Sequence, residues 1–279
     1  MVLVVSLYWR IKTGNTIVIA TVLIARGLAY TVDTLPPETP PSEPMPRKST
    51  ASDDATPTAA TGVELDRKRA PTQTRALETC ERILDAAANL LADVGIERLS
   101  TNLICERAGL SPPALYRYYP NKYAVLAELG VRLMVSQNEL LEKWATPATM
   151  KLPAARFEQR IRELFLDTLA LTRQAIAGEW ITRALRAVPS LAPVRIESHE
   201  HVTGLVVAAF ALAYPGVPQA RVRLVSRLAI EVMYSSQELL VDDATLDADE
   251  VATVMSHMVA TQVLQLRKER GQESGRKRP

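Results

Sequence analysis

The feature that most constrains the fold is the run from Leu99 to Tyr123, where two short helix-forming segments meet at Gly109. Ser100 stands where the first helix begins, because its side-chain oxygen can accept a hydrogen bond from a free N–H group of the first turn. Ser111 restarts the pattern, and the proline that follows it suits a first helical turn. Two short helices joined by a glycine-centred turn form a helix-turn-helix. The second of them is too short to be stable alone, so neighbouring helices must hold it.

This run also gathers tyrosines and cations. Four of the chain's eight tyrosines lie between residues 116 and 123. Hydroxyls and cations on a short element are typical of phosphate positioning. Leu115 and Tyr119 have the spacing of core residues, although Tyr116 could equally be a core aromatic that braces the domain. This spacing leaves the following side chains facing outward: Pro112, Pro113, Ala114, Arg117 and Tyr118.

Long helices are predicted on both sides of this run. Apolar residues recur at steps of three and four from Ala76 until Gly95 stops the pattern, and again from Lys122 to Trp144. Glycine is sparse, and only three Phe and three Trp occur, which favours helices over sheet. We therefore expect an all-α fold. Five further helices, separated by proline-containing boundaries, are expected at residues 154–176, 178–187, 191–213, 218–240 and 247–270.

The first 30 residues do not fit this pattern. The apolar run from Thr16 to Ala25 is shorter than the roughly 20 residues that span a bilayer, and Arg10, Lys12 and Arg26 interrupt any longer run. We interpret the segment as the product of a start codon placed too far upstream. A secretory signal, a membrane anchor and a short docking strand are the alternatives.

A proline-rich stretch follows, and a basic cluster comes after it. Seven prolines between residues 31 and 66, with no apolar period, predict a disordered linker. The cluster consists of Arg67, Lys68, Arg69 and Arg75. It is either an arm that reaches phosphates or the minor groove, or a solvated run of charge.

Composition excludes several classes of function. A net charge of +2 is too small to indicate nucleic-acid binding by itself, so any such surface must be local. Cys80 and Cys105 sit in apolar helical patterns, which indicates buried small side chains in a reducing cytoplasm rather than a disulfide or a redox switch. The sequence contains no CxxC, no HExxH, no glycine-rich phosphate loop and no nucleophile spaced with a base. We expect no enzymatic activity and no cofactor.

The C-terminal two-thirds offer weaker signals. His199 and His201 point to different faces of one helix and make a poor metal pair, so we expect no metal site. An apolar effector cavity is one interpretation of four side chains, and ordinary core is the other. These four residues are Trp180, Phe210, Met233 and Tyr234.

The segment from about Ala76 to Ser136 resembles the N-terminal domain of the TetR family of bacterial transcriptional regulators. The resemblance covers a little over a fifth of the chain. It is carried by Gly95-Ile96-Glu97, Ser100-Thr101, Ile104, Ala108-Gly109-Leu110-Ser111, Leu115 to Tyr119 and Asn121-Lys122. It implies a homodimer whose helix-turn-helix domain, residues 76–136, reads a palindromic DNA operator. Residues 137–270 would form a helical domain for dimerisation and ligand binding, residues 1–66 an apolar start with a disordered tail, and residues 271–279 a basic tail.

The resemblance also implies roles for single residues. Thr101, Tyr116 and Lys122 would contact phosphates, with Ser100 beside them, and the five outward residues named above would lie near base edges. Among these, Arg117 is the side chain that can grip a guanine edge with two hydrogen bonds. The paired prolines, Cys105 in place of the usual alanine, and Leu103 at a usually polar position depart from the family pattern.

These observations lead to one function and one alternative. We expect a cytoplasmic, ligand-responsive repressor that an unknown small molecule releases from DNA, with no stable membrane association. The alternative is a helical interaction module of the same fold without sequence-specific DNA binding, which residues 1–30 could tether to a membrane.

Overall fold

A computed structural model describes residues 9–13, 16–20, 63–68 and 74–276, with side chains described for residues 63–68 and 75–268. The chain divides into two compact units, residues 1–58 and 59–279. In the first unit, β1 (Trp9–Thr13) pairs antiparallel with β2 (Thr16–Ala20), so that Thr13 lies opposite Thr16. These strands occupy the segment that we assigned to a misplaced start. Most of the predicted proline-rich linker lies outside the described residues, and none of the described helices is long and apolar enough to cross a membrane.

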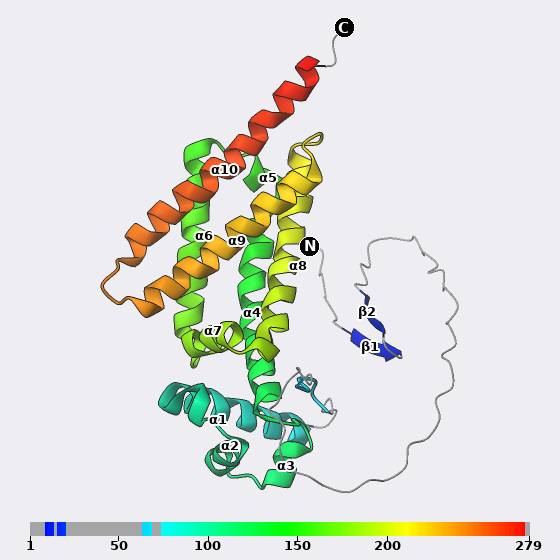
Figure 1. The fold of residues 1–279 in the computed structure, drawn as a ribbon, viewed down its shortest axis with the longest axis vertical. Helices are drawn as coiled ribbons and strands as arrows, with labels where there is room; N and C mark the ends of the chain where they lie inside the picture. The colour runs from blue at the N-terminus through cyan, green and yellow to red at the C-terminus, as the bar shows by residue number, and fades with distance from the viewer. Residues whose placement is uncertain (1–8, 14–15, 21–62, 69–73, 277–279) are drawn as a thin grey trace, which may run out of the picture. The chain divides into compact units, whose positions relative to one another are not determined.

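All the regular secondary structure among the described residues of the second unit is helical, which confirms the all-α prediction for this unit (Figure 1). A short 3₁₀ turn, Pro189–Leu191, precedes α8. The helices are α1 (Thr74–Arg98), α2 (Thr101–Ala108), α3 (Pro112–Tyr116), α4 (Lys122–Trp144), α5 (Pro147–Met150), α6 (Ala154–Gln174), α7 (Gly178–Ala187), α8 (Ala192–Ala213), α9 (Gln219–Asp242) and α10 (Ala248–Arg276).

Local chemistry sets the helix ends around the helix-turn-helix. Gly95 interrupts α1 with φ 73° and ψ 172°, so the predicted stop is confirmed there. The Ser100 hydroxyl accepts a hydrogen bond from the backbone N–H of Leu103 and caps α2. Gly109 ends α2 in the left-handed conformation, with φ 62°, which favours glycine. The Asn121 side chain caps α4 in the same way as Ser100 caps α2.

Helix α4 connects the helix-turn-helix to the rest of the unit and crosses the predicted domain boundary at residues 136 and 137 (Figure 1). It packs against α1 at one end and against α6, α7 and α8 along its length. At Gly130 it lies very close to α7, because a Cβ atom at this position would be only 2.6 Å from a methyl carbon of Leu185. A side chain at this position would therefore force the Leu185 side chain to shift.

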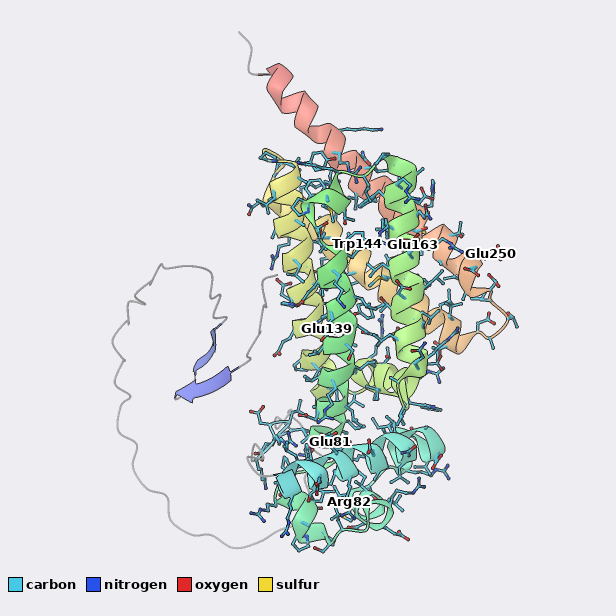
Figure 2. The ribbon with its side chains drawn as sticks, turned by 180° about the vertical axis from the view of Figure 1, so that it is seen from behind. Glu81, Arg82, Glu139, Trp144, Glu163 and Glu250 are labelled. Carbon is cyan, nitrogen blue, oxygen red and sulfur yellow. The ribbon has the colours of Figure 1, made fainter. Side chains whose placement is uncertain are left out.

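An ion pair joins α1 to α4. Both terminal nitrogens of Arg132 on α4 donate to the carboxylate of Glu81 on α1, each at 2.7 Å. The hydrogen bond from Arg132 holds the pKa of the Glu81 carboxyl below its ordinary value. Figure 2 labels Glu81 near this junction and Trp144 near the opposite end of α4. Helix α4 thus extends from the predicted helix-turn-helix domain into the predicted C-terminal helical domain.

A chain of buried polar groups crosses the centre of the helical bundle. His199 on α8 is fully buried, and its Nδ1 lies 3.0 Å from a carboxylate oxygen of Glu231 on α9. Its ring stacks on Tyr234, with 4.3 Å between ring centroids. The Tyr234 hydroxyl donates to the side-chain oxygen of Gln137 on α4, and the Gln137 amide donates to the Thr172 hydroxyl on α6. Burial lowers the pKa of His199, so the buried ring favours its neutral form.

Candidate nucleic-acid interface

Two hydroxyls meet where α2 begins and α3 ends. The Thr101 Oγ1 lies 2.9 Å from the Tyr116 hydroxyl, although the residues are 15 positions apart in sequence. The Tyr116 side chain is 42% exposed. The geometry therefore places two of the predicted phosphate ligands side by side at the surface, where each hydroxyl can still donate to or accept from a further partner.

Helix α3 presents a short, apolar face. Pro112, Pro113 and Arg117 are exposed, and Ala114 is half-buried. Leu115, which points the other way, is fully buried and fixes the helix on the core. The face thus contains four of the five residues that the sequence placed near base edges. Arg117 is the only cation among these four, so it dominates the charge of this face.

The prediction for Tyr118 was wrong. This side chain is only 6% exposed and belongs to the core. The reason is that α3 ends at Tyr116, earlier than the predicted Tyr119, so the tight turn that follows directs both Tyr118 and Tyr119 inward. The carbonyl oxygen of Tyr118 also accepts a hydrogen bond from the backbone N–H of Lys68. Tyr118 therefore supports α3 from behind.

Lys122 and Ser100 have structural partners in addition to their predicted role. The Lys122 ammonium donates to the carbonyl oxygens of Ile96 and Leu99, at 3.0 and 2.8 Å, and so joins the start of α4 to the segment between α1 and α2. An ammonium carries three donors, which leaves one for a phosphate. Ser100 accepts the capping hydrogen bond of α2, which leaves its hydroxyl hydrogen free to donate. Their contacts with DNA remain predictions.

Sequence reasoning missed Arg82. This arginine of α1 donates through Nη2 to the carbonyl oxygens of Ala108 and Gly109 and so fixes the turn between α2 and α3 (Figure 2). The carbonyl groups at the end of a helix lack partners within the helix, so a cation there satisfies them and opposes the helix dipole. Nothing in the sequence distinguishes Arg82 from other exposed arginines, because its target is 26 residues away.

The members of the basic cluster before α1 lie in different environments. The guanidinium of Arg67 lies over the ring of Tyr119, with 5.3 Å from Cζ to the centroid, and 3.8 Å from the Glu128 carboxylate. Neither predicted alternative, a DNA-reaching arm or a solvated run of charge, describes Arg67, because its side chain packs on the domain. Lys68 and Arg75 are exposed, and Arg69 lies outside the described residues.

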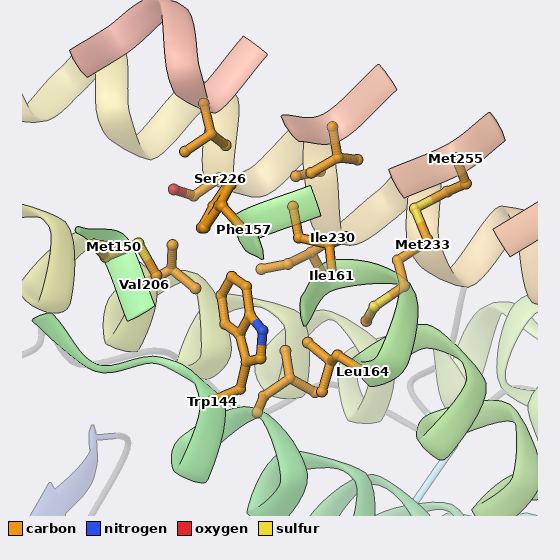
Figure 3. Close-up of a pocket in the computed structure, with 14 residues that line it drawn as sticks. Trp144, Met150, Phe157, Ile161, Leu164, Val206, Ser226, Ile230, Met233 and Met255 are labelled. Atoms are coloured by element: carbon orange, nitrogen blue, oxygen red, sulfur yellow. The ribbon is translucent and has the colours of Figure 1, made fainter. Parts of the chain in front are cut away.

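An apolar cavity lies at the other end of α4, inside the helical bundle (Figure 3). It contains about 530 Å³ of space not filled by atoms, part of it open to solvent. The Trp144 ring points from α4 toward Phe157 of α6, with 5.9 Å between ring centroids. Met233 and Met255 line it from α9 and α10, and the Ser226 hydroxyl is the polar group in the lining apart from the indole N–H. Such a lining suits a mainly apolar molecule.

Three of the four predicted effector residues lie elsewhere. Met233 lines the cavity, as predicted. Trp180 is 40% exposed beneath the guanidinium of Arg183. Phe210 is core and contacts Tyr214, because its helix is apolar around most of its circumference. Tyr234 is buried in the polar chain with His199 and Gln137, so its hydroxyl is already bonded. The cavity is assembled from six helices, so spacing along any one of them could not reveal its other residues.

Comparison with known proteins identifies the N-terminal region. Residues 83–129 match the family model described as bacterial regulatory proteins, tetR family. This helix-turn-helix region therefore matches the N-terminal domain of the TetR family. The match covers the second half of α1, the helix-turn-helix and the start of α4, which are the elements that place Thr101 and Tyr116 side by side.

Curated relatives resemble this chain over the same short region. The class C tetracycline repressor of Escherichia coli is 41% identical over 54 residues, which are 19% of this chain and 25% of the relative. The class D repressor of Escherichia coli is 34% identical over 59 residues, which are 21% of this chain and 27% of the relative. The chain thus spans about a quarter of the length of the curated relatives that it matches.

Solved structures extend the likeness of fold beyond that region. A tetR-family transcriptional regulator from Streptomyces coelicolor aligns with a TM-score of 0.52 and 19% identity, over 70% of this chain and 86% of that chain. A putative TetR-family regulator from Syntrophomonas wolfei aligns with a TM-score of 0.53 and 13% identity, over 67% and 96%. The C-terminal helices therefore share the architecture of these regulators.

Proposed function

We propose that this TetR-family chain is a non-enzymatic repressor of the cytoplasm that binds a palindromic DNA operator as a homodimer and is released by a small, mainly apolar effector. The observation that carries the proposal is the paired hydroxyls of Thr101 and Tyr116 beside the exposed face of α3. Hydroxyls bind phosphate oxygens and fix the register of a helix on DNA, while base edges supply specificity. Arg117 would supply the base contact, supported by apolar contacts of Pro112 and Pro113 with thymine methyl groups.

A gel-shift titration against the DNA that flanks its own gene tests this function. We expect a discrete complex whose affinity falls when Arg117→Ala is introduced, and falls most for half-sites that contain a guanine opposite this residue, by roughly 1 to 3 kcal/mol. Arg156→Ala, which removes an exposed arginine of α6 outside the helix-turn-helix, is the matched control. A uniform response to every base change across the half-site would contradict base reading by Arg117. Absence of any complex with intact protein would favour the interaction module instead.

Homodimerisation is supported by exposed apolar side chains on the last helices. Leu224, Leu228 and Leu239 are each about half exposed on α9, at spacings of four and eleven residues that return to one face of a helix. Val254 and Met258 are similarly exposed on α10, which packs beside α9. Apolar faces of this kind pair across subunits in four-helix bundles.

Sedimentation velocity tests the dimer. Leu228→Glu should convert the dimer to monomer, because it would bury two carboxylates in the interface. Ile176→Glu is the control, since Ile176 and Leu228 are both 56% exposed. A dimer that survives the Leu228 substitution would place the interface on another face.

Release by an effector would act through α4. Leu141 and Trp144 at its C-terminal end line the cavity, and Lys122 at its N-terminal end holds the helix-turn-helix through two carbonyl groups. A molecule in the cavity that favours one position of α4 would therefore change the position of α3. In a dimer such a change alters the spacing of two recognition helices, which must match half-sites about one helical turn of DNA apart.

A further inference from the structure

Arg267 stands at the edge of the apolar cavity. It follows Val263 by one turn of α10, and Val263 lines the cavity. Its guanidinium lies over the ring of Phe157, with 4.4 Å from Cζ to the ring centroid, and near the ring of Tyr214 at 5.7 Å. Phe157 also lines the cavity and approaches Trp144. A positive charge is thus separated from the cavity by no more than one aromatic side chain.

The hydrogen bonding of this guanidinium is incomplete. Its Nη1 donates to the carbonyl oxygen of Leu152 at 2.7 Å, but its Nε and Nη2 are buried and have no acceptor among the described residues. Buried donors without acceptors are costly, and arginine does not escape the cost by releasing its proton. Burial lowers the pKa of Arg267, and no carboxylate in the described part of the chain forms an ion pair with it.

Other arginines of the same bundle are paired. Arg162 on α6 contacts the Asp249 carboxylate, and Arg183 on α7 contacts the Asp242 carboxylate. Both pairs are largely at the surface, where water could have replaced the partner. Of these three arginines, Arg267 alone has buried nitrogens without an acceptor, and it lacks an anion among the described residues, which is the reverse of the arrangement expected for a purely structural arginine.

The two unsatisfied atoms form a defined binding edge. Nε and Nη2 lie on the same side of the planar guanidinium, so their N–H bonds run side by side. Two parallel donors of this kind match the two oxygens of a carboxylate. The neighbouring cavity offers only apolar groups and the Ser226 hydroxyl to the rest of a ligand.

We propose that the effector is an amphipathic organic anion, whose apolar body fills the cavity between α4, α6, α9 and α10 and whose carboxylate binds Nε and Nη2 of Arg267. That the bound anion acts as an effector rests on the proposed ligand-responsive function, but its binding to the cavity requires no DNA. It names a class, monocarboxylates with a flexible apolar body, and it assigns the selection against neutral molecules to Arg267.

Binding of dodecanoate, with dodecanol as its neutral counterpart, tests the proposal. Both are titrated into the full chain without DNA, and the tryptophan fluorescence or the heat of binding is recorded. We expect dodecanoate to bind about tenfold or more tightly than dodecanol, the factor that a charge-assisted hydrogen bond supplies. Arg267→Met, which keeps an apolar stem over Phe157, should abolish this preference and leave dodecanol binding within about threefold.

Two further variants keep the test interpretable. Arg267→Lys retains a cation without the two-pronged edge and should keep part of the preference. Arg162→Met removes a cation of α6 away from the cavity and should keep all of it. Dodecanol binding by Arg267→Met shows that its cavity is intact. The proposal is overturned if the intact chain shows no preference for the anion, or if Arg267→Met retains it. A gel shift without ligand tests operator binding separately, so a failure of anion binding and a failure of DNA binding can be distinguished.

Discussion

Lys122 allows a structural role and a DNA-contacting role to be separated by measurement. In the structure its ammonium bonds the carbonyl oxygens of Ile96 and Leu99. Hydrogen bonds to charged groups contribute roughly 1.5 to 3 kcal/mol each. Because Lys122 is only partly buried, we take the lower end of that range for each of its two hydrogen bonds and expect Lys122→Met to reduce the free energy of unfolding by about 3 kcal/mol. Methionine keeps the apolar stem, so the loss reports on the ammonium.

Urea unfolding at pH 7 measures this loss. Lys143→Met is the control, since Lys143 is exposed on the same helix, and a surface change of this kind stays within about 0.5 kcal/mol. The same variants are then titrated with operator DNA at several salt concentrations. Each phosphate contact contributes roughly −0.9 to the slope of log K against log salt.

The two roles predict different pairs of results. If Lys122 acts by holding α4 to the segment between α1 and α2, Lys122→Met loses stability and affinity but keeps the salt slope. If its third N–H also binds a phosphate, the slope becomes shallower by about one per subunit in addition to the loss of stability. Unchanged stability with a shallower slope would refute the structural role of Lys122.

Tyr116, His199 and Glu81 each give a further prediction. Tyr116→Phe should weaken operator binding several-fold with a change in unfolding free energy within about 0.5 kcal/mol, because it removes an exposed hydroxyl; fluorescence anisotropy and urea unfolding decide this. Because burial lowers the pKa of His199, the unfolded chain binds a proton at this ring more readily than the native chain does. The free energy of unfolding should therefore fall as the pH drops below about 6.5, by at most about 1.4 kcal/mol per pH unit. His199→Gln should flatten this pH dependence in urea titrations between about pH 7.5 and 5.5. The hydrogen bond from Arg132 lowers the pKa of Glu81, so the carboxylate stabilises the fold above its unfolded-state pKa and loses this effect as the pH falls through its folded-state pKa. Glu81→Gln should therefore lower the free energy of unfolding by about 0.5 kcal/mol at pH 7. An equal loss in thermal unfolding at about pH 3 would contradict this origin.

The helices could be predicted because their signals are local. Gly95, Ser100, Gly109 and Asn121 each act through their own backbone conformation or through a hydrogen bond within a few residues. The missed helical elements, α5 and the turn at residues 189–191, are each under five residues long and too short to show a helical period.

The candidate site could be predicted only in part, because its remaining contacts join distant segments. The exposure of Pro112 and Arg117 follows from the helical period. Tyr118 broke that rule because α3 ends one turn early. Arg82 reaches carbonyl groups 26 residues away, which spacing cannot reveal. The cavity is harder still, because apolar residues that leave space have the same sequence pattern as apolar residues that fill it.

The contact of Gly130 with Leu185 divides α4 into unequal arms. With a rise of 1.5 Å per residue, roughly 12 Å of helix separate Gly130 from Lys122 and roughly 21 Å separate it from Trp144. If α4 tilts about this close contact, Trp144 and Lys122 move in opposite directions, and a displacement of about 1 Å at the cavity becomes about 0.6 Å beside the helix-turn-helix. The movement at the recognition helix would then be smaller than the movement at the cavity, and the force there would be correspondingly larger.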